Sequence, residues 1–400
     1  MINYRDYSKL RNIVTFVTYN LAKFLVLFFK KKDNVWVFGE KQGTLFSSNA
    51  KYLFLYVLRN HKSIKPIWFT NKPDIIKEVS DLGGKSYLIN SLKAFYYGLV
   101  AKVYIFTVGL SDIGNFAVRN ALIINLWHGM PIKNLNNTRN VRKIKYSCFV
   151  RNYEMLIAKI TTKQLKKYHL LIATSEVTKS TIEASFPNNP VKITGEPKND
   201  ILYQNIERKI ILEKYSLQQY ESKKIVTYLP TFRLLHDYRF LFNENEDIDE
   251  IDNFIILEKS HANDLEMSKR GNNYRKNIIN ISNTNIDTQE LLCITDILIT
   301  DYSSCYVDFL LTGKPVIFYP YDLEDYQKTQ GFFFEYKSIV SGPIVKNEKS
   351  LLKAIISNLN DDSLYQVERK KQMDFFHLYQ DDNSSHRVYS EIMILLDSIE

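Results

Sequence analysis

The chain contains very little cysteine, which narrows the kind of protein it can be. Only three cysteines occur in 400 residues, Cys148, Cys293 and Cys305, and they are widely separated. A disulfide framework needs a denser and more regular set, so we expect free thiols in a reducing compartment. No CxxC or HExxH pattern is present, and the sequence therefore offers no motif for a metal site.

The common phosphate-binding signatures of nucleotide enzymes are also missing. The chain has no GxxxxGK[ST] loop, which disfavours a P-loop ATPase, and no GxGxxG after a strand, which leaves an NAD-type site unsupported. Asp247-Ile248-Asp249 resembles a metal-binding DxD motif, but it lies inside the acidic stretch 243–252. We interpret that stretch as a solvated surface segment.

No apolar run is long enough to be a clear membrane span. Apolar residues recur at helical spacing over residues 8–32, but the apolar part covers about seventeen residues, whereas a span needs about 20. No small-residue cleavage site follows, so a signal peptide is not expected. An interfacial helix on anionic lipid, a helix packed on the protein itself and a transmembrane anchor remain open. The basic end, Lys30-Lys31-Lys32, favours the first.

The chain is basic, with a net charge of +9 and a pI of about 9.0. This balance suits anionic partners such as nucleic acid, anionic lipid or phosphate-bearing substrates. No nucleic-acid-binding motif accompanies the charge, so nucleic acid is not an expected partner. Apolar residues make up 45% of the chain, which is enough for the cores of two or three domains.

Strand and helix patterns alternate along most of the chain. Short apolar runs predict strands at 35–39, 67–70, 86–89, 103–107, 121–126, 169–174, 191–194, 225–229, 254–257, 278–281, 297–299 and 316–319. Helical spacing predicts helices at 49–58, 75–82, 91–99, 177–186, 348–359 and within 364–399. Residues 326–336 are interpreted as a loop. This alternation predicts an α/β fold with mostly parallel sheets covered on both faces, in two domains that meet near residues 200–220.

Residues 294–322 are the most informative stretch. A strand ending at Thr300-Asp301, the turn Tyr302-Ser303-Ser304, a short helix and a second strand make a βαβ unit. The turn places Ser303 and Ser304 at a helix N-terminus, where free backbone N–H groups and hydroxyls favour an anion. Simple helix capping explains the same residues, so both interpretations stay open.

Polar clusters follow several of the predicted strands. They contain His128, Gly195 with Asn199 and Asp200, Thr231 with Arg233, His261, and Asp301 to Ser304. Ligands of open α/β sheets bind beyond the carboxyl ends of the strands. The sequence therefore predicts an enzyme whose cleft is lined by these clusters.

Five segments resemble the CDP-glycerol glycerophosphotransferases, the enzymes that make teichoic acids and related phosphate-containing capsules. They are LWHGMPIK (126–133), GEPKND (195–200), YLPTFR (228–233), KSH (259–261) and DILITDYSSCYVDFLLTGKPVIFYPYDLEDY (296–326). The resemblance runs from about residue 35 to about residue 345. The chain departs from the family pattern in having Lys198 for Arg, Ala262 for Pro and Met130 for Thr. Lys198 keeps the charge without the bidentate fork of Arg, which bears on the choice of donor.

The resemblance implies a GT-B-like fold, in which two Rossmann-like domains enclose the active site. We expect an N-terminal membrane-associating helix over 1–33, an acceptor domain over 34–205, a CDP-donor domain over 206–375 and a closing helix over 376–400. The resemblance also implies peripheral attachment to the cytoplasmic face of a bacterial cell membrane, with the anionic membrane surface as a partner.

The implied reaction is the transfer of a polyol phosphate from CDP-glycerol or CDP-ribitol to a hydroxyl group of a lipid-linked or capsular polysaccharide acceptor, with release of CMP. Neither a cofactor nor a metal is expected, because GT-B-type transferases commonly use a helix dipole and basic side chains in place of a metal. A glycosyltransferase using a nucleotide sugar and a membrane-bound scaffold without activity are the alternatives.

The resemblance also assigns roles to single residues. His128 is expected to be the general base on the acceptor hydroxyl, since imidazole titrates near working pH, and His261 to contact or protonate the pyrophosphate. Ser303 and Ser304 would hold the phosphates, helped by Arg233. The full expected donor-binding set is Gly195, Asn199, Asp200, Thr231, Arg233, Asp301, Ser303, Ser304 and Asp308. For Asp308 a structural role is equally open.

Overall fold

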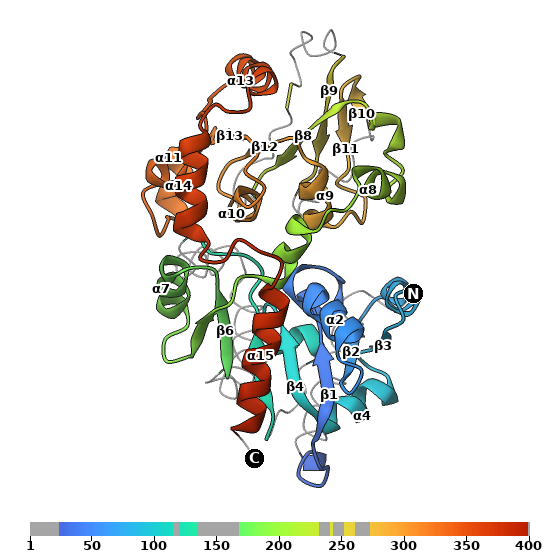
Figure 1. The fold of residues 1–400 in the computed structure, drawn as a ribbon. Helices are drawn as coiled ribbons and strands as arrows, with labels where there is room; N and C mark the ends of the chain where they lie inside the picture. The colour runs from blue at the N-terminus through green and yellow to red at the C-terminus, as the bar shows by residue number, and fades with distance from the viewer. Residues whose placement is uncertain are drawn as a thin grey trace, which may run out of the picture.

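The computed structural model describes residues 24–114, 120–133, 168–231, 241–242, 252–260 and 273–398. Within them the chain forms two separate sheets, each covered by helices, which occupy the lower and upper halves of Figure 1. The parallel α/β, GT-B-like architecture is thereby confirmed. Residues 1–23 of the expected N-terminal helix lie outside the described ranges. In those ranges no helix has the length and apolar character needed to cross a membrane.

The first sheet has seven parallel strands in the order β3-β2-β1-β4-β5-β6-β7. They are β1 (Lys32–Phe38), β2 (Lys65–Thr70), β3 (Lys85–Leu88), β4 (Ala101–Phe106), β5 (Leu122–Asn125), β6 (Leu170–Ala173) and β7 (Val191–Ile193). Successive side chains of β1 enter opposite cores, because a strand alternates its faces. Trp36 packs with α2 (Ser48–Asn60) and α3 (Pro73–Asp81), and Val37 packs with α4 (Leu92–Val100).

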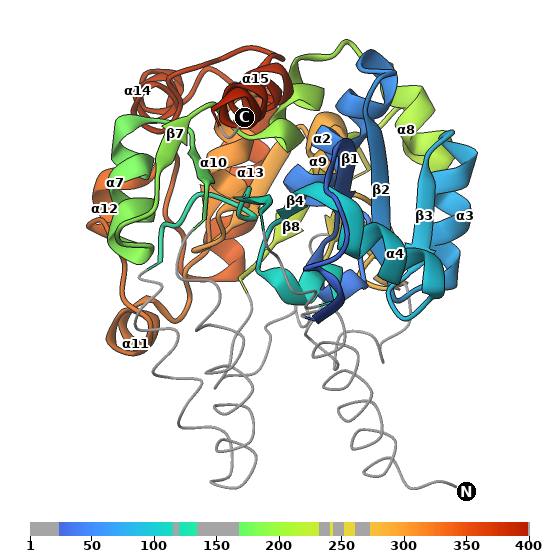
Figure 2. The same ribbon diagram turned by 90° about the horizontal axis from the view of Figure 1, so that it is seen from below.

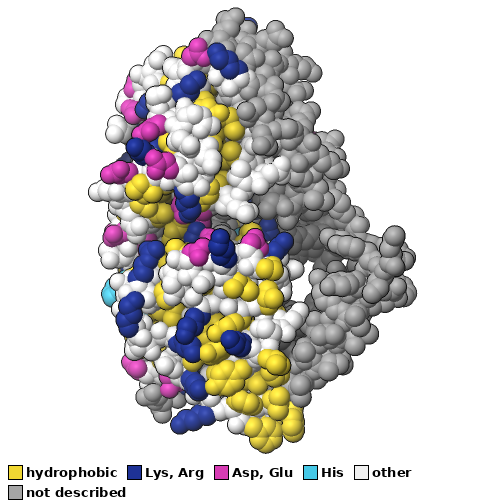
Figure 3. Space-filling model, turned by 90° about the vertical axis from the view of Figure 1, so that its right-hand side faces the viewer, with side chains coloured by type: hydrophobic (Ala, Val, Ile, Leu, Met, Phe, Trp, Pro, Cys, Tyr) yellow, Lys and Arg dark blue, Asp and Glu magenta, His cyan; other side chains and the backbone are white. Residues whose placement is uncertain are grey.

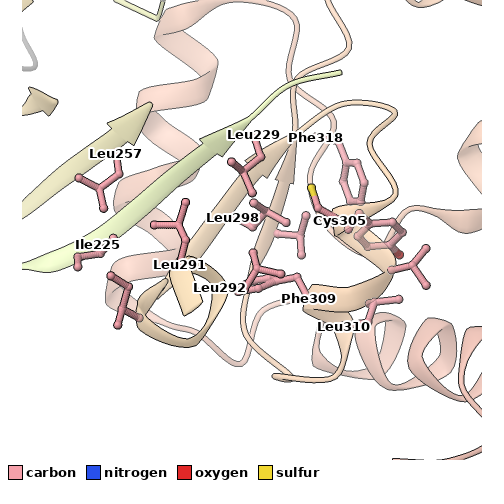
Figure 4. Close-up of a cluster of buried hydrophobic side chains, with 14 of the residues drawn as sticks. Ile225, Leu229, Leu257, Leu291, Leu292, Leu298, Cys305, Phe309, Leu310 and Phe318 are labelled. Atoms are coloured by element: carbon pink, nitrogen blue, oxygen red, sulfur yellow. The ribbon is translucent and has the colours of Figure 1, made fainter. Parts of the chain in front are cut away.

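The second sheet has six strands in the order β10-β11-β9-β8-β12-β13. They are β8 (Lys224–Leu229), β9 (Phe254–Glu258), β10 (Asn273–Arg275), β11 (Ile278–Asn280), β12 (Ile297–Thr300) and β13 (Val316–Phe318). Only the β10–β11 pair is antiparallel among these. One face packs on α8 (Arg208–Lys214), α9 (Thr288–Ile294) and α10 (Cys305–Leu310), whose leucines and Phe309 gather against the strands in Figure 4. The other face packs on α13 (Glu348–Asn360).

The end of the chain passes from the second half of the molecule back to the first. Helix α14 (Gln366–Phe376) lies beside α10, and α15 (Ser384–Asp397) runs along the first sheet in Figure 1. Val388, Ile392 and Leu396 of α15 belong to the same buried cluster as Trp36. The first half of the molecule therefore takes part of its core from the last helix.

The predicted strands are confirmed with end shifts of one to three residues. Two interpretations were wrong. Residues 326–336 are not one loop, because α11 (Leu323–Thr329) and α12 (Tyr336–Ile339) begin and end the region, and Tyr326 and Tyr336 pack around Tyr302. The turn expected at 195–200 continues as a 3₁₀ helix, η3 (Pro197–Tyr203). Helix α7 (Glu176–Ser185) follows the prediction, and its N-cap Ser175 accepts the backbone N–H of Thr178.

Candidate active site

A sharp turn after β5 presents His128 at the carboxyl end of the first sheet. Trp127 has φ +54° and Gly129 has φ +150°, so the chain bends on both sides of the histidine. The side chain of Asn125 fixes the turn by accepting the Trp127 N–H at 2.9 Å. The Trp127 ring packs edge-on against Phe186 of the next layer, with ring centroids 5.1 Å apart. The same Trp127 ring lies 4.4 Å from the His128 ring between centroids, so it packs the turn on both sides.

The His128 side chain is exposed to solvent, although protein atoms lie on most sides of it. Burial in that surrounding lowers the pKa of His128 to about 4, and the nearby charges of Lys198, Lys133 and Lys41 act in the same direction. Nδ1 lies 3.5 Å from the Thr107 carbonyl, which favours the tautomer with its proton on Nδ1. The imidazole is therefore neutral at pH 7, with Nε2 as its basic nitrogen.

The His128 turn touches the second half of the molecule at Ser304. A Cβ atom on Gly129 would lie 2.6 Å from Ser304 Oγ and 3.7 Å from Lys198 Nζ. Ser304 is the N-cap of α10, and neither it nor Ser303 is fully buried. The two predicted parts of the site, one from each sheet, are therefore brought together, and Gly129 lies against Ser304 where they meet.

Two further predicted residues meet at the end of the second sheet. The carboxylate of Asp301 accepts the backbone N–H of Thr231 at 2.9 Å and that of Tyr302. Both residues follow neighbouring strands, β12 and β8, which explains their closeness. Asp301 thus holds the two strand ends in register directly before Ser303.

A buried network ties η3 of the first half to α10 of the second. Lys198 Nζ lies 2.6 Å from Asp308 Oδ2, and Asn199 Nδ2 donates to Asp308 Oδ1 at 3.0 Å. Gln289 Nε2 donates to Asn199 Oδ1 at 2.8 Å. Asn199 and Asp308, expected on the donor, therefore have their polar atoms engaged with protein groups. They position α10 and its serines instead.

The same network reaches the His128 turn through Asn49 of α2. Its side-chain amide donates to the carbonyl of Trp127 at 3.1 Å and to Glu196 Oε1 at 2.9 Å. Its Oδ1 accepts the Lys198 N–H at 3.2 Å. One asparagine thus connects the histidine turn, Glu196 and Lys198.

The charges in this network are balanced around Lys198. Burial alone would lower the pKa of Lys198, but the nearby Asp308 and Glu196 outweigh burial and raise it, so the ammonium stays charged. Burial raises the pKa of Glu196 to about 7, with Lys198 opposing and Asp308 adding to the rise. The charged Lys198 and the raised pKa of Glu196 therefore have the same origin, a buried cluster of ionisable groups.

A second contact between the halves runs from α2 to the start of α9. Lys51 Nζ lies 2.7 Å from Asp287 Oδ2, and the Tyr52 hydroxyl donates to Asp287 Oδ1 at 3.1 Å. Asp287 also caps α9 by accepting the Gln289 N–H. The two sheets are thus fixed to each other close to the candidate site.

Gly195 and Asp200 were expected on the donor, but the structure places them under α15. Both carboxylate oxygens of Asp200 accept backbone N–H groups at the start of that helix, from Ser384 at 2.9 Å and Ser385 at 2.8 Å. A Cβ on Gly195 would lie 2.4 Å from Ser384 Oγ. Their role here is to seat the last helix, since a helix N-terminus favours a carboxylate and close packing needs a glycine.

Two predicted residues, Arg233 and His261, lie outside the described residues. Of the described ones, no three His, Cys, Asp or Glu side chains are grouped so that they could hold a metal ion. The positive charges near the site come from Lys41, Lys133, Lys198 and Lys259.

Sequence reasoning missed several residues that shape the site. Asn49, Lys51 and Gln289 lie inside helices, where nothing in the local pattern marks them. Glu196 carried a usable signal, because it is a charged residue directly after a strand, in the same segment as the predicted Asn199. Lys41 also follows a strand, β1, so the same rule could have placed it near the site.

Comparison with known proteins agrees with this arrangement. The family model for CDP-Glycerol:Poly(glycerophosphate) glycerophosphotransferase matches residues 21–394. The two joined α/β halves and their strand-end polar site are thus those of a phosphotransferase. The chain belongs to the CDP-glycerol:poly(glycerophosphate) glycerophosphotransferase family.

Individual relatives extend the comparison. The teichoic acid poly(glycerol phosphate) polymerase of Bacillus spizizenii (strain W23) is 26% identical over 362 residues, covering 86% of this chain and 88% of the relative. The teichoic acid ribitol-phosphate polymerase TarK of Staphylococcus aureus is 32% identical over 213 residues, covering 50% of this chain and 40% of the relative. A solved structure of the wall teichoic acid polymerase TagF superposes with a TM-score of 0.72 at 24% identity, covering 97% of this chain and 95% of that one. At this identity the structural match establishes the fold.

Proposed function

We propose that this protein transfers glycerol phosphate from CDP-glycerol to a hydroxyl group of a teichoic-acid-like or capsular polysaccharide acceptor and releases CMP. The observation that carries the proposal is the contact of the His128 turn with Ser304, which sets a neutral imidazole from one sheet against a pair of serines from the other. The description of the matched family names the same donor, CDP-glycerol.

The proposed chemistry is a single displacement at phosphorus. The acceptor hydroxyl gives its proton to Nε2 of His128 while its oxygen attacks the β-phosphorus of the donor. The bond from that phosphorus to the oxygen bridging the two phosphates breaks, and CMP leaves with the bond electrons. Such reactions depend on positioning and charge stabilisation more than on covalent catalysis. Ser303 and Ser304 supply neutral hydroxyl donors to the phosphate oxygens.

The low pKa of His128 is compatible with this role, because a bound substrate would raise it. A bound pyrophosphate brings negative charge close to the ring, and negative charge raises the pKa of an imidazole. The base thus becomes stronger only when there is a donor to attack. His261, expected on the pyrophosphate, and Arg233 complete the proposal from outside the described residues.

We also propose that the first sheet and its helices bind the acceptor, and that the second binds the CDP moiety. Supporting this division, the expected base follows a strand of the first sheet, whereas Thr231, Asp301, Ser303 and Ser304 all follow strands of the second. Lys198, which replaces the usual family Arg, is held by Asp308 and does not take part in donor binding in this division.

A ribitol phosphate donor is the second candidate. The relative TarK is a ribitol-phosphate polymerase and matches half of this chain at higher identity than the glycerol-phosphate polymerase does over most of it. The transfer chemistry is the same for both polyols, so only the polyol contacts separate the two donors.

The decisive experiment is CMP release by the purified protein, with CDP-glycerol and CDP-ribitol supplied separately and a lipid-linked or polysaccharide acceptor present. Release with CDP-glycerol supports the proposal, and release with CDP-ribitol alone assigns the second candidate. No release with either, together with UDP or GDP release from a nucleotide sugar, would show a glycosyltransferase on the same fold.

We propose a peripheral position on the anionic cytoplasmic face of the membrane, through a basic apolar patch. The patch consists of Phe24, Leu27, Phe28, Phe29, Lys30, Lys32, Leu92, Lys93 and Tyr96. Phe28 is 71% exposed and Leu92 is 88% exposed, which is unusual for side chains of this size. Lys32 Nζ donates to the Tyr96 hydroxyl at 2.9 Å, so the segment before β1 and helix α4 form one surface.

Figure 3 shows hydrophobic side chains with lysines beside them at the lower end of the molecule. Apolar side chains flanked by cations suit an interface of acyl chains and anionic headgroups. Residues 26–31 form no helix and β1 begins at Lys32, so a helix over 1–33 would have to end earlier than expected; the part of it before residue 24 would continue this surface.

A further inference from the structure

The loop after β1 has an unusual backbone beside the candidate site. Three consecutive residues have left-handed conformations, Lys41 at φ +41°, Gln42 at φ +57° and Gly43 at φ +74°. Buried Asp112 holds the loop in place. Its Oδ1 accepts the Gln42 N–H at 2.8 Å, and its Oδ2 accepts the Val108 N–H at 2.8 Å. A left-handed conformation is unfavourable for a residue with a side chain, so the loop is built to hold Lys41 in one place.

Among the residues that the structure describes, none forms an ion pair with the ammonium group of Lys41, although the neighbouring Glu40 acts on its charge. Lys41 is half-buried, and its side chain makes no hydrogen bond or ion pair with any residue that the structure describes. The two nearest candidates are unsuitable. Burial raises the pKa of Glu40 well above its usual range, which disfavours the charged form of that carboxyl. The oxygens of Asp112 already accept backbone N–H groups.

The Lys41 loop lies next to a residue that contacts His128, because Asp112 accepts the N–H groups of both Gln42 and Thr107, and the Thr107 carbonyl lies 3.5 Å from His128 Nδ1. The charge of Lys41 acts on His128, which follows β5 of the first sheet, and on Lys259, which follows β9 of the second. Lys259 has a partner of its own, since its Nζ donates to the Ile286 carbonyl at 2.6 Å. A half-buried, unpaired cation at this place is unfavourable unless an anion binds there.

We propose that Lys41 binds a phosphate oxygen of the substrate next to His128 and holds that phosphate in position for the transfer. This inference rests on the proposed function and adds to it a residue that no motif of the family resemblance contained. Two substrates could supply this phosphate. One is the pyrophosphate of the CDP donor, and the other is the phosphodiester at the end of a polymer acceptor.

Phosphate binding at Lys41 would also change the basicity of His128. With the cleft empty, the charge of Lys41 helps to keep His128 unprotonated. When a phosphate pairs with Lys41, that effect is cancelled, and the imidazole becomes a stronger base. Lys41 is thus a positioning residue whose neutral replacement changes both substrate affinity and the proton affinity of His128.

The test compares Lys41→Met with Lys41→Arg and with the control Lys62→Met. Lys62 is an exposed lysine after α2, away from the strand ends that carry the site. We expect Lys41→Met to raise the KM of one substrate by tenfold or more, the effect of losing one charge-assisted hydrogen bond. Lys41→Arg should restore most of the affinity, and Lys62→Met should behave as the wild type. The substrate whose KM rises identifies the source of the phosphate.

A binding measurement keeps this inference separate from the proposed function. Calorimetric titration with inorganic pyrophosphate needs no turnover, and it should show an affinity at least tenfold weaker for Lys41→Met than for the wild type and Lys62→Met. If the wild type binds pyrophosphate through Lys41 but releases no CMP from either donor, Lys41 is confirmed as a phosphate-binding residue and the proposed transfer reaction is rejected. Equal affinities and equal KM values in all variants would overturn the inference, as would a wild type that binds no pyrophosphate. Melting temperatures confirm that each variant is folded, and Lys41→Gln replaces Lys41→Met if the latter is not.

Discussion

Gly129 and Ser304 lie against each other where the two halves of the molecule meet. A Cβ atom on Gly129 would lie 2.6 Å from Ser304 Oγ, closer than carbon and oxygen can pack. Gly129 belongs to the turn that carries the proposed base, and Ser304 belongs to the turn that receives the phosphates. The His128 turn can therefore lie this close to Ser304 only because Gly129 has no side chain.

Gly129→Ala should reduce CMP release by on the order of 10²-fold, because a shift of about 1 Å between catalytic groups has an effect of that size. The conformation of Gly129, at φ +150°, adds strain of its own. Gly83→Ala is the matched control, since Gly83 also has a positive φ, +80°, but open space around its Cβ position. If both variants release CMP at the wild-type rate, the contact has no role in catalysis.

His128→Asn should lower the transfer rate by about 10² or more, which is the usual contribution of a general base. The His128 side chain is exposed, and its contacts are a 3.5 Å approach to Thr107 and a packing contact with the Trp127 ring, so the melting temperature should change little. The measurement is CMP release under saturating donor, with thermal unfolding as the control. A folded variant with wild-type activity would exclude His128 as the base.

Asp308→Ala should destabilise the protein by roughly 3–5 kcal/mol, because it leaves the buried ammonium of Lys198 without its main partner. Both side chains are nearly inaccessible, at 6% and 4%. Denaturant unfolding measures the change. The control is Asp374→Ala, which breaks an exposed pair with Lys370 and should have little effect. Equal effects of the two substitutions would show that the buried pair is no stronger than a surface one.

Glu196→Gln should change how stability depends on pH. Burial raises the pKa of Glu196 to about 7, above its value in the unfolded chain, so protonation favours the folded state. The stability from this group is complete below about pH 4.5 and is lost as the pH rises through 7. Thermal unfolding between pH 5 and 8 should therefore show the variant gaining stability relative to the wild type as pH increases. A constant difference across this range would mean that Glu196 is ionised throughout.

Phe28→Glu and Leu92→Glu should each reduce co-sedimentation with vesicles that contain anionic lipid, because each places a negative charge on the basic apolar patch. Val367→Glu is the control, since Val367 of α14 is 79% exposed but outside the patch. Neutral phosphatidylcholine vesicles should bind the wild type weakly. Binding that is unchanged in both patch variants would remove this surface from the membrane contact.

Much of the fold could be predicted because the strands are short buried apolar runs. Residues 254–258 and 297–300 show this pattern, and all of them are buried. The missed elements lack it. Strand β10 (Asn273–Arg275) is a polar edge strand of three residues, and α8 and α9 have only seven residues each. Helix α11 was missed because its one aromatic residue, Tyr326, packs on Tyr302 of an earlier segment.

The candidate site was predictable in part for a similar reason. His128, Asp301, Ser303 and Ser304 follow strands directly, so the general rule for α/β sheets places them at one edge. The positions of Gly195 and Asp200 depend on α15, which returns from the far end of the chain. The partners of Asp308 depend on how the two sheets meet. Neither relationship leaves a local signal in the sequence.

The return of α15 to the first sheet has a consequence for synthesis of the protein on the ribosome. The apolar face around Trp36 emerges early but receives Val388, Ile392 and Leu396 only when the last helix has been made. Until then, Asp200 has no helix N-terminus to cap, and the apolar face is partly uncovered. The newly made chain would need protection there, so a ribosome-associated chaperone that shields this face would help the full-length protein to fold.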